Sequence, residues 1–423
     1  MPKDTKAPKL FFDSLKGGYW LQLASSRFLL LSTEQARLHL RYAGLYGGKV
    51  EEGLNDMDKA LYVAQVENAV DYAGPLAGHR CGVFQTSSGE KILVTSEPRC
   101  ECFELSKDAS EFPLLERFLT ELFGKKQLPF VLGWLKYARQ SLRHGDFRPG
   151  QLFVLAGPSD CGKSLFQALV TEFLGGRVGR PYRYMAGDTP FNRDLAAAEH
   201  LMIEDEHAST DIRTRRKFGA ALKDFTVNRE MSIHGKGKEA LTLPTYKRVT
   251  LSVNNEPENL MILPPLDGSV LDKIMLFKCS QADLSEDRKA NWLRLTNDLP
   301  ALASYLQQWS VPRSMRSTRF GVTAFHNPEL LELLADIAPE TRLLNLIDQV
   351  LFAKSVTFWR GTAEQLEKEL RGSSFGFAVE KLLYFSSASG VYLSRLAQKH
   401  PERFEVRKVN GKTDWLIKES QHE

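Results

Sequence analysis

The sequence predicts an α/β fold organised around a parallel β-sheet. Apolar runs of strand length alternate with helical segments from about residue 146 to residue 277, which is the order that parallel strands joined by helices require. One such run leads into a glycine-rich loop, and another, about forty residues later, ends in three consecutive acids. Together these features predict a phosphate-binding site at the carboxyl ends of the strands.

The loop at residues 157–164 fits the pattern G-x-x-x-x-G-K-[ST] at every fixed position. An apolar run, 151–156, precedes it and a helical run, 165–170, follows it. Backbone N–H groups of the loop and the helix N-terminus would bind phosphates. Lys163 would reach the β- and γ-phosphates of ATP, and the Ser164 hydroxyl would bind Mg²⁺. The predicted nucleotide-binding residues are Gly157, Pro158, Ser159, Asp160, Cys161, Gly162, Lys163, Ser164 and Leu165.

The acidic strand at 201–206 would place carboxylates beside the nucleotide. Its apolar residues predict burial, and its acids emerge at the carboxyl end of the strand. We assign Asp205 to the Mg²⁺-bound water shell and Glu206 to the base that polarises the attacking water. Because Glu204 is also acidic, the pair Glu204–Asp205 is an alternative register.

A third strand, 248–253, ends at Asn254. A polar amide at that edge can orient the lytic water against the γ-phosphate, although an Asn after a strand is more often part of a turn. Before this strand, two alternating runs at 231–243 enclose a tip rich in glycine and lysine, which predicts a hairpin. His234, Lys236 and Lys238 at this tip suit a nucleic-acid backbone, since lysines neutralise phosphates without reading sequence. The alternative is a solvated turn.

Composition bounds the protein class. The chain has 423 residues, 43% hydrophobic and 26% charged, as in ordinary globular proteins of two to four domains. No apolar run approaches the length of a membrane span, the N-terminus lacks the apolar core of a signal peptide, and five scattered cysteines favour a reducing cytoplasm. Net charge is +4, with basic excess in 206–248 (ten Lys/Arg, five Asp/Glu) and 395–418 (seven, three). Such excess suits a polyanion or a solvated face.

Five segments follow from these patterns. Residues 1–108 predict a mixed α/β N-terminal domain, and 109–146 a helical linker or collar whose helices, within 112–144, break near Gly124 and Pro129. The sheet with its phosphate loop occupies 147–300, and 301–352 is helical. Residues 353–423 predict a winged helix, because two helices are followed by strands that flank Asn410-Gly411, a strong hairpin signal.

The order of parts from about residue 147 to 277 resembles the superfamily 3 helicases, members of the AAA+ ATPases found in small viruses, phages and mobile elements. It is most similar to the poxvirus-type and phage primase-helicases, in which a Lys-Asp segment such as 222–225 precedes the hairpin. The resemblance implies a hexameric ring that hydrolyses ATP between subunits and translocates on single-stranded DNA. Lys236 or Lys238 would then grip the DNA, and Asn254 would be the sensor of the γ-phosphate.

Two features depart from that family. Its members complete the ATP site with an arginine from the neighbouring subunit, and the corresponding stretch here, 267–274, offers Lys273, which lacks the bidentate fork of arginine. Arg229 is another candidate, as is one of a group of three arginines, Arg213, Arg215 and Arg216. The roughly hundred residues before the linker are also short for a primase domain. We therefore expect no primer synthesis.

A zinc site is a further hypothesis for the N-terminal domain. His79, Cys81, Cys100 and Cys102 lie on two short segments, and tetrahedral zinc accepts three thiolates and an imidazole. Ligands spaced by one residue point to opposite faces of a straight strand, so the site would need turns or bulges. Unliganded cysteines are the default interpretation.

The sequence thus predicts a DNA-dependent ATPase that works as the replicative helicase of a phage or mobile element. Single-stranded DNA would be its partner, and the winged helix would bind duplex DNA, for example at an origin. The main alternative is an ATP-switched initiator or helicase loader without processive unwinding. A small-molecule kinase is disfavoured, because such an enzyme needs neither the hairpin nor the winged helix and usually has an arginine-rich lid.

Overall fold

The computed structural model describes residues 9–23, 27–99, 111–204, 212–234, 240–264, 266, 270–284, 287–336, 338–352, 357–409 and 412–419. The chain divides into two compact units. The first comprises Met1–Asn255 and Ile262–His326, and the second comprises Glu256–Met261 and Asn327–Glu423. Within the described residues, no helix combines the length and the apolar character that crossing a membrane would require.

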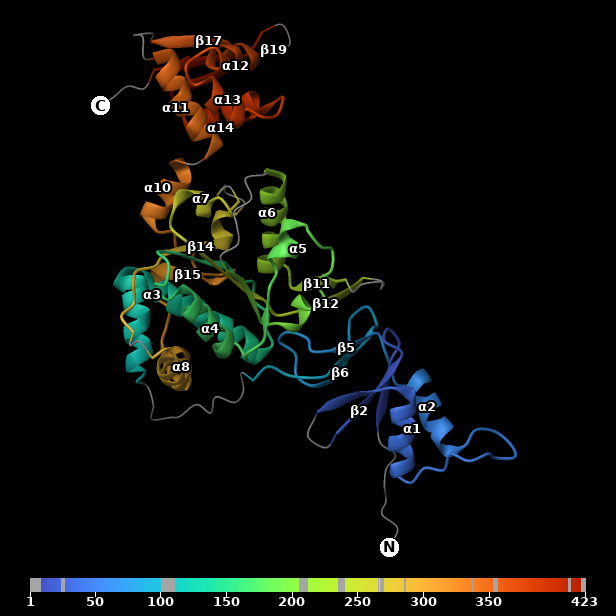
Figure 1. Ribbon diagram of the computed structural model, residues 1–423. Coiled ribbons are helices and arrows are strands. Elements are labelled where there is room, and N and C mark those ends of the chain that lie inside the picture. The colour runs from blue at the N-terminus through green and yellow to red at the C-terminus, as the bar shows by residue number, and fades with distance from the viewer. Residues whose placement is uncertain are drawn as a thin grey trace. The chain divides into compact units, whose positions relative to one another are not determined.

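A five-stranded parallel sheet forms the centre of the first unit (Figure 1). Its strands stand in the order β14-β8-β13-β10-β9, and every neighbouring pair is parallel. Their bounds are Ile274–Lys278 for β14, Leu152–Ala156 for β8, Arg248–Val253 for β13, His200–Glu204 for β10 and Val178–Gly179 for β9. The predicted α/β architecture with a parallel sheet is confirmed.

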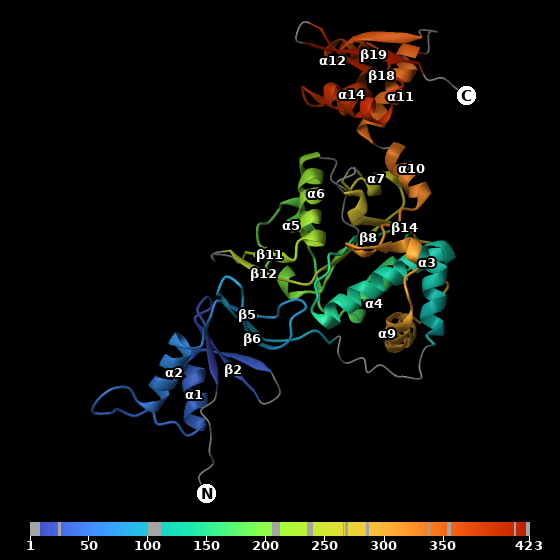
Figure 2. The ribbon, with the colours of Figure 1, turned by 180° about the vertical axis from the view of Figure 1, so that it is seen from behind.

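Helices cover both faces of this sheet, with α4 on one side and α6 on the other (Figures 1 and 2). The first unit also contains short elements between the strands. The helices are α3 (Pro113–His144), α4 (Lys163–Phe173), α5 (Tyr182–Ala186), α6 (Ile212–Val227), α8 (Arg288–Asn297) and α9 (Leu299–Gln308). The shorter elements are η2 (Leu195–Ala197), η3 (Leu271–Lys273), η4 (Arg313–Met315), β15 (Arg316–Ser317) and β16 (Gly321–Val322).

Aromatic packing joins α3 to the sheet. The ring of Phe123 lies 5.8 Å from that of Phe153 in β8 and 5.7 Å from that of Phe277 in β14, edge to face in both cases. Such pairs stabilise a core beyond the area that they bury. Between these contacts and the end of α3, the helix kinks at Gly124, whose φ of 68° and ψ of 162° are not helical.

The break predicted near Pro129 is absent, because the helix continues through this residue. The ring of Pro129 removes only the hydrogen bond to the first residue after the kink at Gly124, where an unpaired carbonyl is easily accommodated. The glycine alone therefore divides α3 into two segments.

The predicted hairpin is present as β11 (Glu230–Ile233) paired with β12 (Leu241–Pro244). Its register runs from Glu230 opposite Pro244 to Ile233 opposite Leu241. The tip at 235–239, which carries Lys236 and Lys238, lies outside the described residues.

The N-terminal part of the first unit contains two small sheets. One has the order β3-β2-β1-β4 and packs against α1 and α2, and the other has the order β5-β7-β6. The bounds are β1 (Leu10–Asp13), β2 (Gly18–Gln22), β3 (Phe28–Leu31), α1 (Thr33–Tyr42), α2 (Asp56–Val66), β4 (Ala69–Val70), β5 (Tyr72–Gly74), β6 (Gly82–Gln85) and β7 (Lys91–Val94).

A buried carboxylate connects the β5–β7 segment to the central sheet. Glu199, fully buried beside the start of β10, accepts hydrogen bonds from the backbone N–H of Gly78 at 2.8 Å and from Nε of Arg177 at 2.8 Å. Arg177 also donates to the carbonyl oxygen of Ser96 at 3.2 Å. Because a buried charge needs such partners, these bonds fix the small sheet on the larger one.

The second unit is a helical cluster with a three-stranded antiparallel sheet of order β17-β19-β18. Thr362 and Gln365 form the predicted capping box at the start of α12, and Trp415 and Ile417 of β19 enter the core. The bounds are α7 (Pro257–Leu260), α10 (Pro328–Asp336), α11 (Pro339–Leu351), β17 (Phe358–Thr362), α12 (Ala363–Arg371), α13 (Gly376–Leu382), α14 (Ala388–Lys399), β18 (Phe404–Val409) and β19 (Lys412–Lys418). The Asn410-Gly411 turn lies outside the described residues.

Because Glu199 of the Glu199–Arg177 pair is fully buried, we predict that removing its charge lowers the stability of the protein strongly. Glu199→Gln keeps the side-chain shape but leaves the Arg177 guanidinium, whose side chain is 19% exposed, without its counter-charge. We expect the free energy of unfolding, measured in urea, to fall by about 3 kcal/mol. We also expect faster proteolysis within residues 72–98.

The matched control is Arg37→Gln, which removes the cation of a solvent-exposed pair with Asp58 in the same unit. This change should cost less than about 1 kcal/mol. Equal effects of the two substitutions would contradict the role assigned to the buried pair.

Candidate nucleotide-binding site

The predicted phosphate loop lies between the carboxyl end of β8 and the start of α4. Gly162 has a φ of 113°, and a Cβ there would lie 3.0 Å from the ring of Phe118. Asp160 has a φ of 57°, the only positive value at a non-glycine residue among the described ones. These conformations turn the chain sharply before the helix, which is why the pattern demands glycine at position 162.

Lys163 lies inside the loop and is 6% exposed. Its Nζ donates to the carbonyl oxygens of Gly157 at 2.8 Å and Pro158 at 2.6 Å. Asn254, directly after β13, places its Oδ1 3.4 Å from the same Nζ. The structure thus brings the predicted sensor amide to the predicted phosphate-binding lysine, because β13 is the direct neighbour of β8.

The segment 279–282, which follows β14, packs against the phosphate loop. The sequence did not indicate this contact. The carbonyl oxygen of Cys279 would lie 2.6 Å from a Cβ at Gly157, so only glycine fits there. Ala282 donates its N–H to the carbonyl oxygen of Cys161 at 3.3 Å, and Gln281 donates to that of Asp160 at 3.2 Å. No local pattern marks 279–282 as part of the site, because it meets the loop only through the pairing of β14 with β8.

The acidic strand is β10, which runs parallel to β13. Asp205 and Glu206, the assigned metal and base residues, directly follow it but lie outside the described residues. Glu204 pairs with Nη1 of Arg180. In the alternative register, Glu204 would be the metal-binding acid, but its carboxylate is already paired with Arg180. We therefore keep the assignment of Asp205 to the metal and Glu206 to the base.

A chain of buried hydrogen bonds holds α4 on β10 and β13. Gln167 of α4 donates from Nε2 to Oγ1 of Thr250 at 2.7 Å. Nε2 of His200 lies 2.8 Å from that hydroxyl, and its Nδ1 lies 2.7 Å from Oγ1 of Thr171. Thr171 donates in turn to the carbonyl oxygen of Gln167 at 3.2 Å.

The donors in this chain determine the tautomer of His200. Because the Thr171 hydroxyl donates to a carbonyl, it must accept from Nδ1–H of the imidazole. Nε2 then accepts from the hydroxyl of Thr250, which itself accepts from Gln167. The ring is therefore neutral, and burial lowers the pKa of His200 to about 3.

The hairpin residue His234 directly follows β11 and lies next to a buried asparagine. Its backbone N–H donates to Oδ1 of Asn192 at 2.8 Å, and Nδ2 of Asn192 donates to the carbonyl oxygen of Ser232 at 2.8 Å. These bonds fix the described part of the hairpin strand on the first unit. His234 thus lies where the chain leaves β11 for the tip.

The candidate subunit-bridging cations occupy different surroundings. Lys273 is 9% exposed and its Nζ lies 2.7 Å from Oδ1 of Asp272. Arg319 lies 3.3 Å from Oδ2 of the same carboxylate. Arg229 is exposed on the turn before β11. The side chains of the other three candidates, Arg213, Arg215 and Arg216, lie outside the described residues.

Only two of the four candidate zinc ligands, His79 and Cys81, are described. Nε2 of His79 is 2.7 Å from the carbonyl oxygen of Pro244, and its ring stacks on Phe84 at 4.8 Å. Burial raises the pKa of the Cys81 thiol, which disfavours the thiolate that zinc needs. The described residues include no cluster of three or more His, Cys, Asp or Glu able to hold a metal. Zinc therefore stays an untested prediction.

The fold of nearly the whole chain is similar to that of the NrS-1 C-terminal region. Two apo structures of that region each give a TM-score of 0.58 with 14% identity, over 98% of this chain and 97% of the other. At this identity the likeness shows a shared fold. The active helicase Cch of SCCmec type IV gives a TM-score of only 0.30, with 10% identity over 93% of this chain and 73% of the other, which carries no argument. No protein-family model and no curated protein matches the sequence.

The buried imidazole predicts loss of stability in acid. In the unfolded chain His200 has its ordinary pKa of 6.5, so between pH 6.5 and about 3 the unfolded state binds the extra proton and stability falls as the pH falls. At about pH 5 the loss should reach about 2 kcal/mol, and above pH 6.5 it should vanish.

Urea unfolding of the wild type and of His200→Gln, measured over this pH range, checks this expectation. The glutamine has no titration, so the variant should lose less stability on acidification, whatever its stability at neutral pH. Parallel pH profiles for the two proteins would show that His200 does not titrate on unfolding.

Proposed function

We propose that this protein is an ATP-hydrolysing motor that translocates on single-stranded DNA as a helicase. The observation that carries the proposal is the meeting of Lys163 with Asn254 at one edge of a parallel sheet, with the acidic strand ending at the same edge. A phosphate-binding lysine and a polar amide converge there from strands far apart in the sequence. This is the arrangement that phosphoryl transfer to water needs.

The residues divide the work of ATP hydrolysis. The loop N–H groups and the N-terminus of α4 hold the phosphates, and Lys163 exchanges its loop carbonyls for phosphate oxygens. Glu206 accepts the proton of the attacking water, and Asn254 orients that water. Residue assignments at Asp205 and Glu206 rest on their position after β10.

Magnesium fits the oxygen donors at this edge. Ser164 is exposed in the first turn of α4, and its hydroxyl is the kind of ligand that Mg²⁺ accepts. Together with Asp205 it would hold the ion and its waters. When bound, Mg²⁺ supplies neutralisation of the charge on the phosphates.

The finer features of the proposal come from the family resemblance. We propose a superfamily 3 motor that assembles as a ring, most simply a hexamer, in the cytoplasm of a cell that carries a phage or mobile element. The hairpin residues His234, Lys236 and Lys238 would contact the strand. Among the candidate bridging cations, Arg229 is better placed than Lys273, because Lys273 is buried and paired with Asp272.

The domain divisions at 1–108, 109–146, 147–300, 301–352 and 353–423 belong to the same proposal. The order of α12, α14, β18 and β19 supports a winged helix in the last segment. Its basic residues at 395–418 would contact duplex DNA. This part of the proposal is independent of the ATPase.

ATP hydrolysis with and without single-stranded DNA tests the function. Lys163→Ala should lower hydrolysis by about a hundredfold or more, because it removes a cation that stabilises the transferring phosphoryl group. The double variant Lys236→Ala/Lys238→Ala should keep basal hydrolysis and lose the stimulation by DNA. Lys289→Ala, an exposed lysine of α8, is the matched control and should match the wild type.

If DNA leaves an active ATPase unchanged, the motor proposal fails. An initiator or helicase loader that uses ATP as a switch would then take its place. If DNA stimulates hydrolysis, strand-displacement measurements decide whether unwinding is processive.

A further inference from the structure

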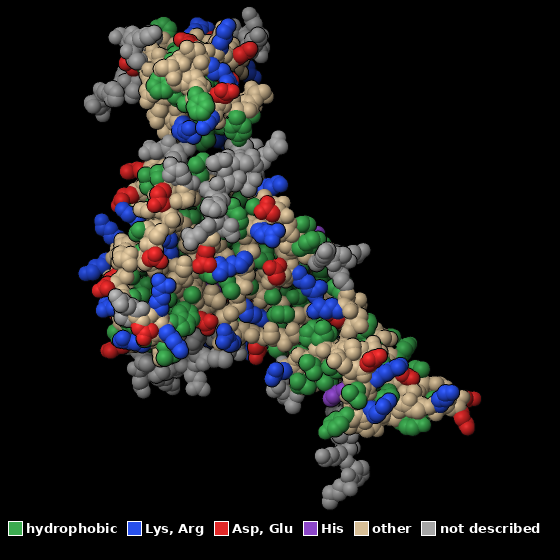
Figure 3. All heavy atoms as spheres, viewed as in Figure 1, with side chains coloured by type: hydrophobic (Ala, Val, Ile, Leu, Met, Phe, Trp, Pro, Cys, Tyr) green, Lys and Arg blue, Asp and Glu red, His purple; other side chains and the backbone are tan. Residues whose placement is uncertain are grey.

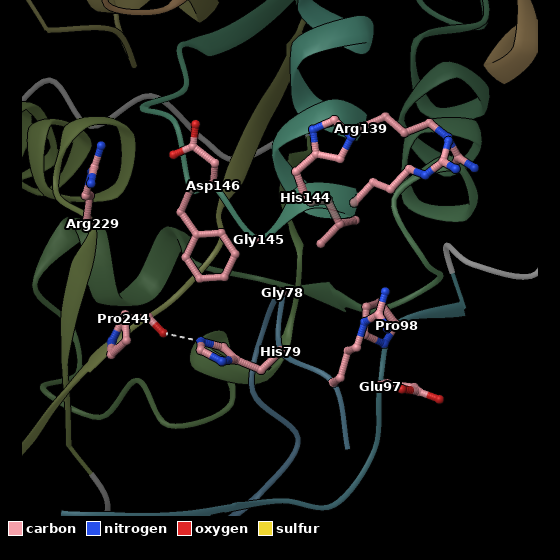
Figure 4. Close-up of a pocket in the computed structure, with 14 residues that line it drawn as sticks. Gly78, His79, Glu97, Pro98, Arg139, His144, Gly145, Asp146, Arg229 and Pro244 are labelled. Carbon is pink, nitrogen blue, oxygen red and sulfur yellow. Dashed lines mark hydrogen bonds between the residues drawn. The ribbon is translucent and has the colours of Figure 1, made fainter. Parts of the chain in front are cut away.

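A cavity of about 980 Å³ lies in the first unit, and Figure 4 shows the residues that line it. It stands at the opposite edge of the central sheet from the phosphate loop. Phe147 lines it a few residues before β8 begins, and Pro244 lines it just before β13. Both residues therefore stand at the amino ends of parallel strands, whereas the loop stands at the carboxyl ends. Apart from Arg229, the proposed subunit-bridging cation, this cavity shares no residue with the proposed ATP site.

Positive charge dominates the lining of this cavity. Four arginines face it, against two carboxylates: Arg80, Arg139, Arg143 and Arg229, against Glu97 and Asp146. On the face drawn in Figure 3, by contrast, basic and acidic side chains are interspersed. A concave surface lined by arginines concentrates anions, and guanidinium forks match phosphate groups in particular.

The arginines combine a fixed member with accessible ones. Arg139 is 8% exposed, donates from Nη1 to the carbonyl oxygen of Phe173 at 3.1 Å and lies over the ring of that residue at 5.0 Å. Arg80, Arg143 and Arg229 are exposed. The exposed guanidinium groups can reorient toward a ligand, whereas the buried Arg139 keeps its positive charge at a fixed position in the cavity wall.

Aromatic rings also line the cavity. Phe147, half-buried, meets the ring of His79 edge to face at 5.3 Å. A Cβ at Gly78 would lie 2.7 Å from the Phe147 ring, so glycine permits this close approach. An aromatic face beside a row of cations is the combination on which bases of a single strand stack while its phosphates are neutralised.

A second cavity borders this one at one end and the base of a hairpin borders it at the other, an extended arrangement that suits a polymer better than a small molecule. The second cavity, of about 180 Å³, shares Arg139, Arg143 and His144 with the first and extends to Gln307 of α9. At the other end stands the base of the β11–β12 hairpin, where Thr245 donates to the carbonyl oxygen of Arg229 at 3.1 Å. The proposed DNA-contacting tip belongs to this same hairpin.

We propose that this basic cavity binds the sugar–phosphate backbone of the single strand and leads it along α3 to the base of the hairpin. The inference rests on the proposed function, since it gives the motor a second contact with its track. It assigns strand binding to Arg80 and Arg143, from segments that no nucleic-acid motif marks.

The test is binding of a fluorescent oligothymidylate, measured by fluorescence anisotropy without ATP over a series of NaCl concentrations. Arg80→Gln/Arg143→Gln should weaken binding about tenfold or more at low salt. The slope of log K against log salt should become shallower by about 1.4, about 0.7 for each lost phosphate contact. Arg80→Lys/Arg143→Lys should keep the slope, because it keeps the charges, while losing part of the affinity with the guanidinium forks.

The matched control is Arg288→Gln/Arg294→Gln, which removes two exposed arginines from α8 in the same unit. Its affinity and slope should equal those of the wild type. An equal loss in both double variants would mean that general charge, not the cavity, binds the strand, and would overturn the proposal. Binding of tripolyphosphate by a protein that does not bind the oligothymidylate would also overturn it.

Failure of this inference is distinct from failure of the motor. The Arg80→Gln/Arg143→Gln substitutions, made in the Lys236→Ala/Lys238→Ala background, measure the contribution of the cavity to binding without that of the hairpin lysines. The slope of log K against log salt should again become shallower by about 1.4. An unchanged slope there, in a protein whose ATPase is stimulated by DNA when the lysines are present, overturns the cavity and leaves the motor standing. If the protein hydrolyses no ATP but the cavity substitutions still make the slope shallower, the motor proposal fails and the cavity proposal stands.

Discussion

The buried hydrogen-bond chain from Gln167 through Thr250 and His200 to Thr171 is the constraint on which the site depends. It joins the helix that follows the phosphate loop to the strand that ends in Asn254 and to the strand that ends in the acids. An unpaired polar group in a core costs several kcal/mol, so the hydrogen bonds that these side chains form favour the observed placement of the three elements. The hydrogen bonds therefore hold three elements against one another: the helix after the predicted phosphate loop and the two strands that precede Asn254 and the acids.

The parallel sheet gives this constraint its chemical use. All carboxyl ends meet at one edge, so residues separated by about ninety positions, Lys163 and Asn254, come within 3.4 Å of each other. The segment after β14 packs against the phosphate loop, where Cys279 lies close to Gly157. The loop is thus held in its turned conformation both by this backbone contact and by the side chains of Lys163 and Gln281.

The two edges of the sheet differ in charge and in partners. The proposed nucleotide site lies at the carboxyl edge, and the arginine-lined cavity stands at the amino edge, where Glu199 and Arg177 attach the β5–β7 segment. The hairpin begins at the cavity, and the strand that follows the hairpin, β13, leads to Asn254. In the proposed motor, strand β13 therefore connects the nucleotide site directly to the side where we place the nucleic acid.

By itself, the sequence determined the phosphate loop, the parallel α/β class and the hairpin, because each of these depends on residues that are close together in the chain. The loop follows from a glycine pattern, the α/β class from alternating apolar runs, and the hairpin from a turn between two strands. It also marked the break at Gly124, although it added one at Pro129 that the first turn of the helix absorbs. Only the tertiary structure decided that Asn254 meets Lys163, that His200 is a neutral partner of two threonines, and that arginines from three segments share one cavity. The physical reason is strand order, β14-β8-β13-β10-β9, which depends on packing between distant segments and leaves no trace in any local pattern.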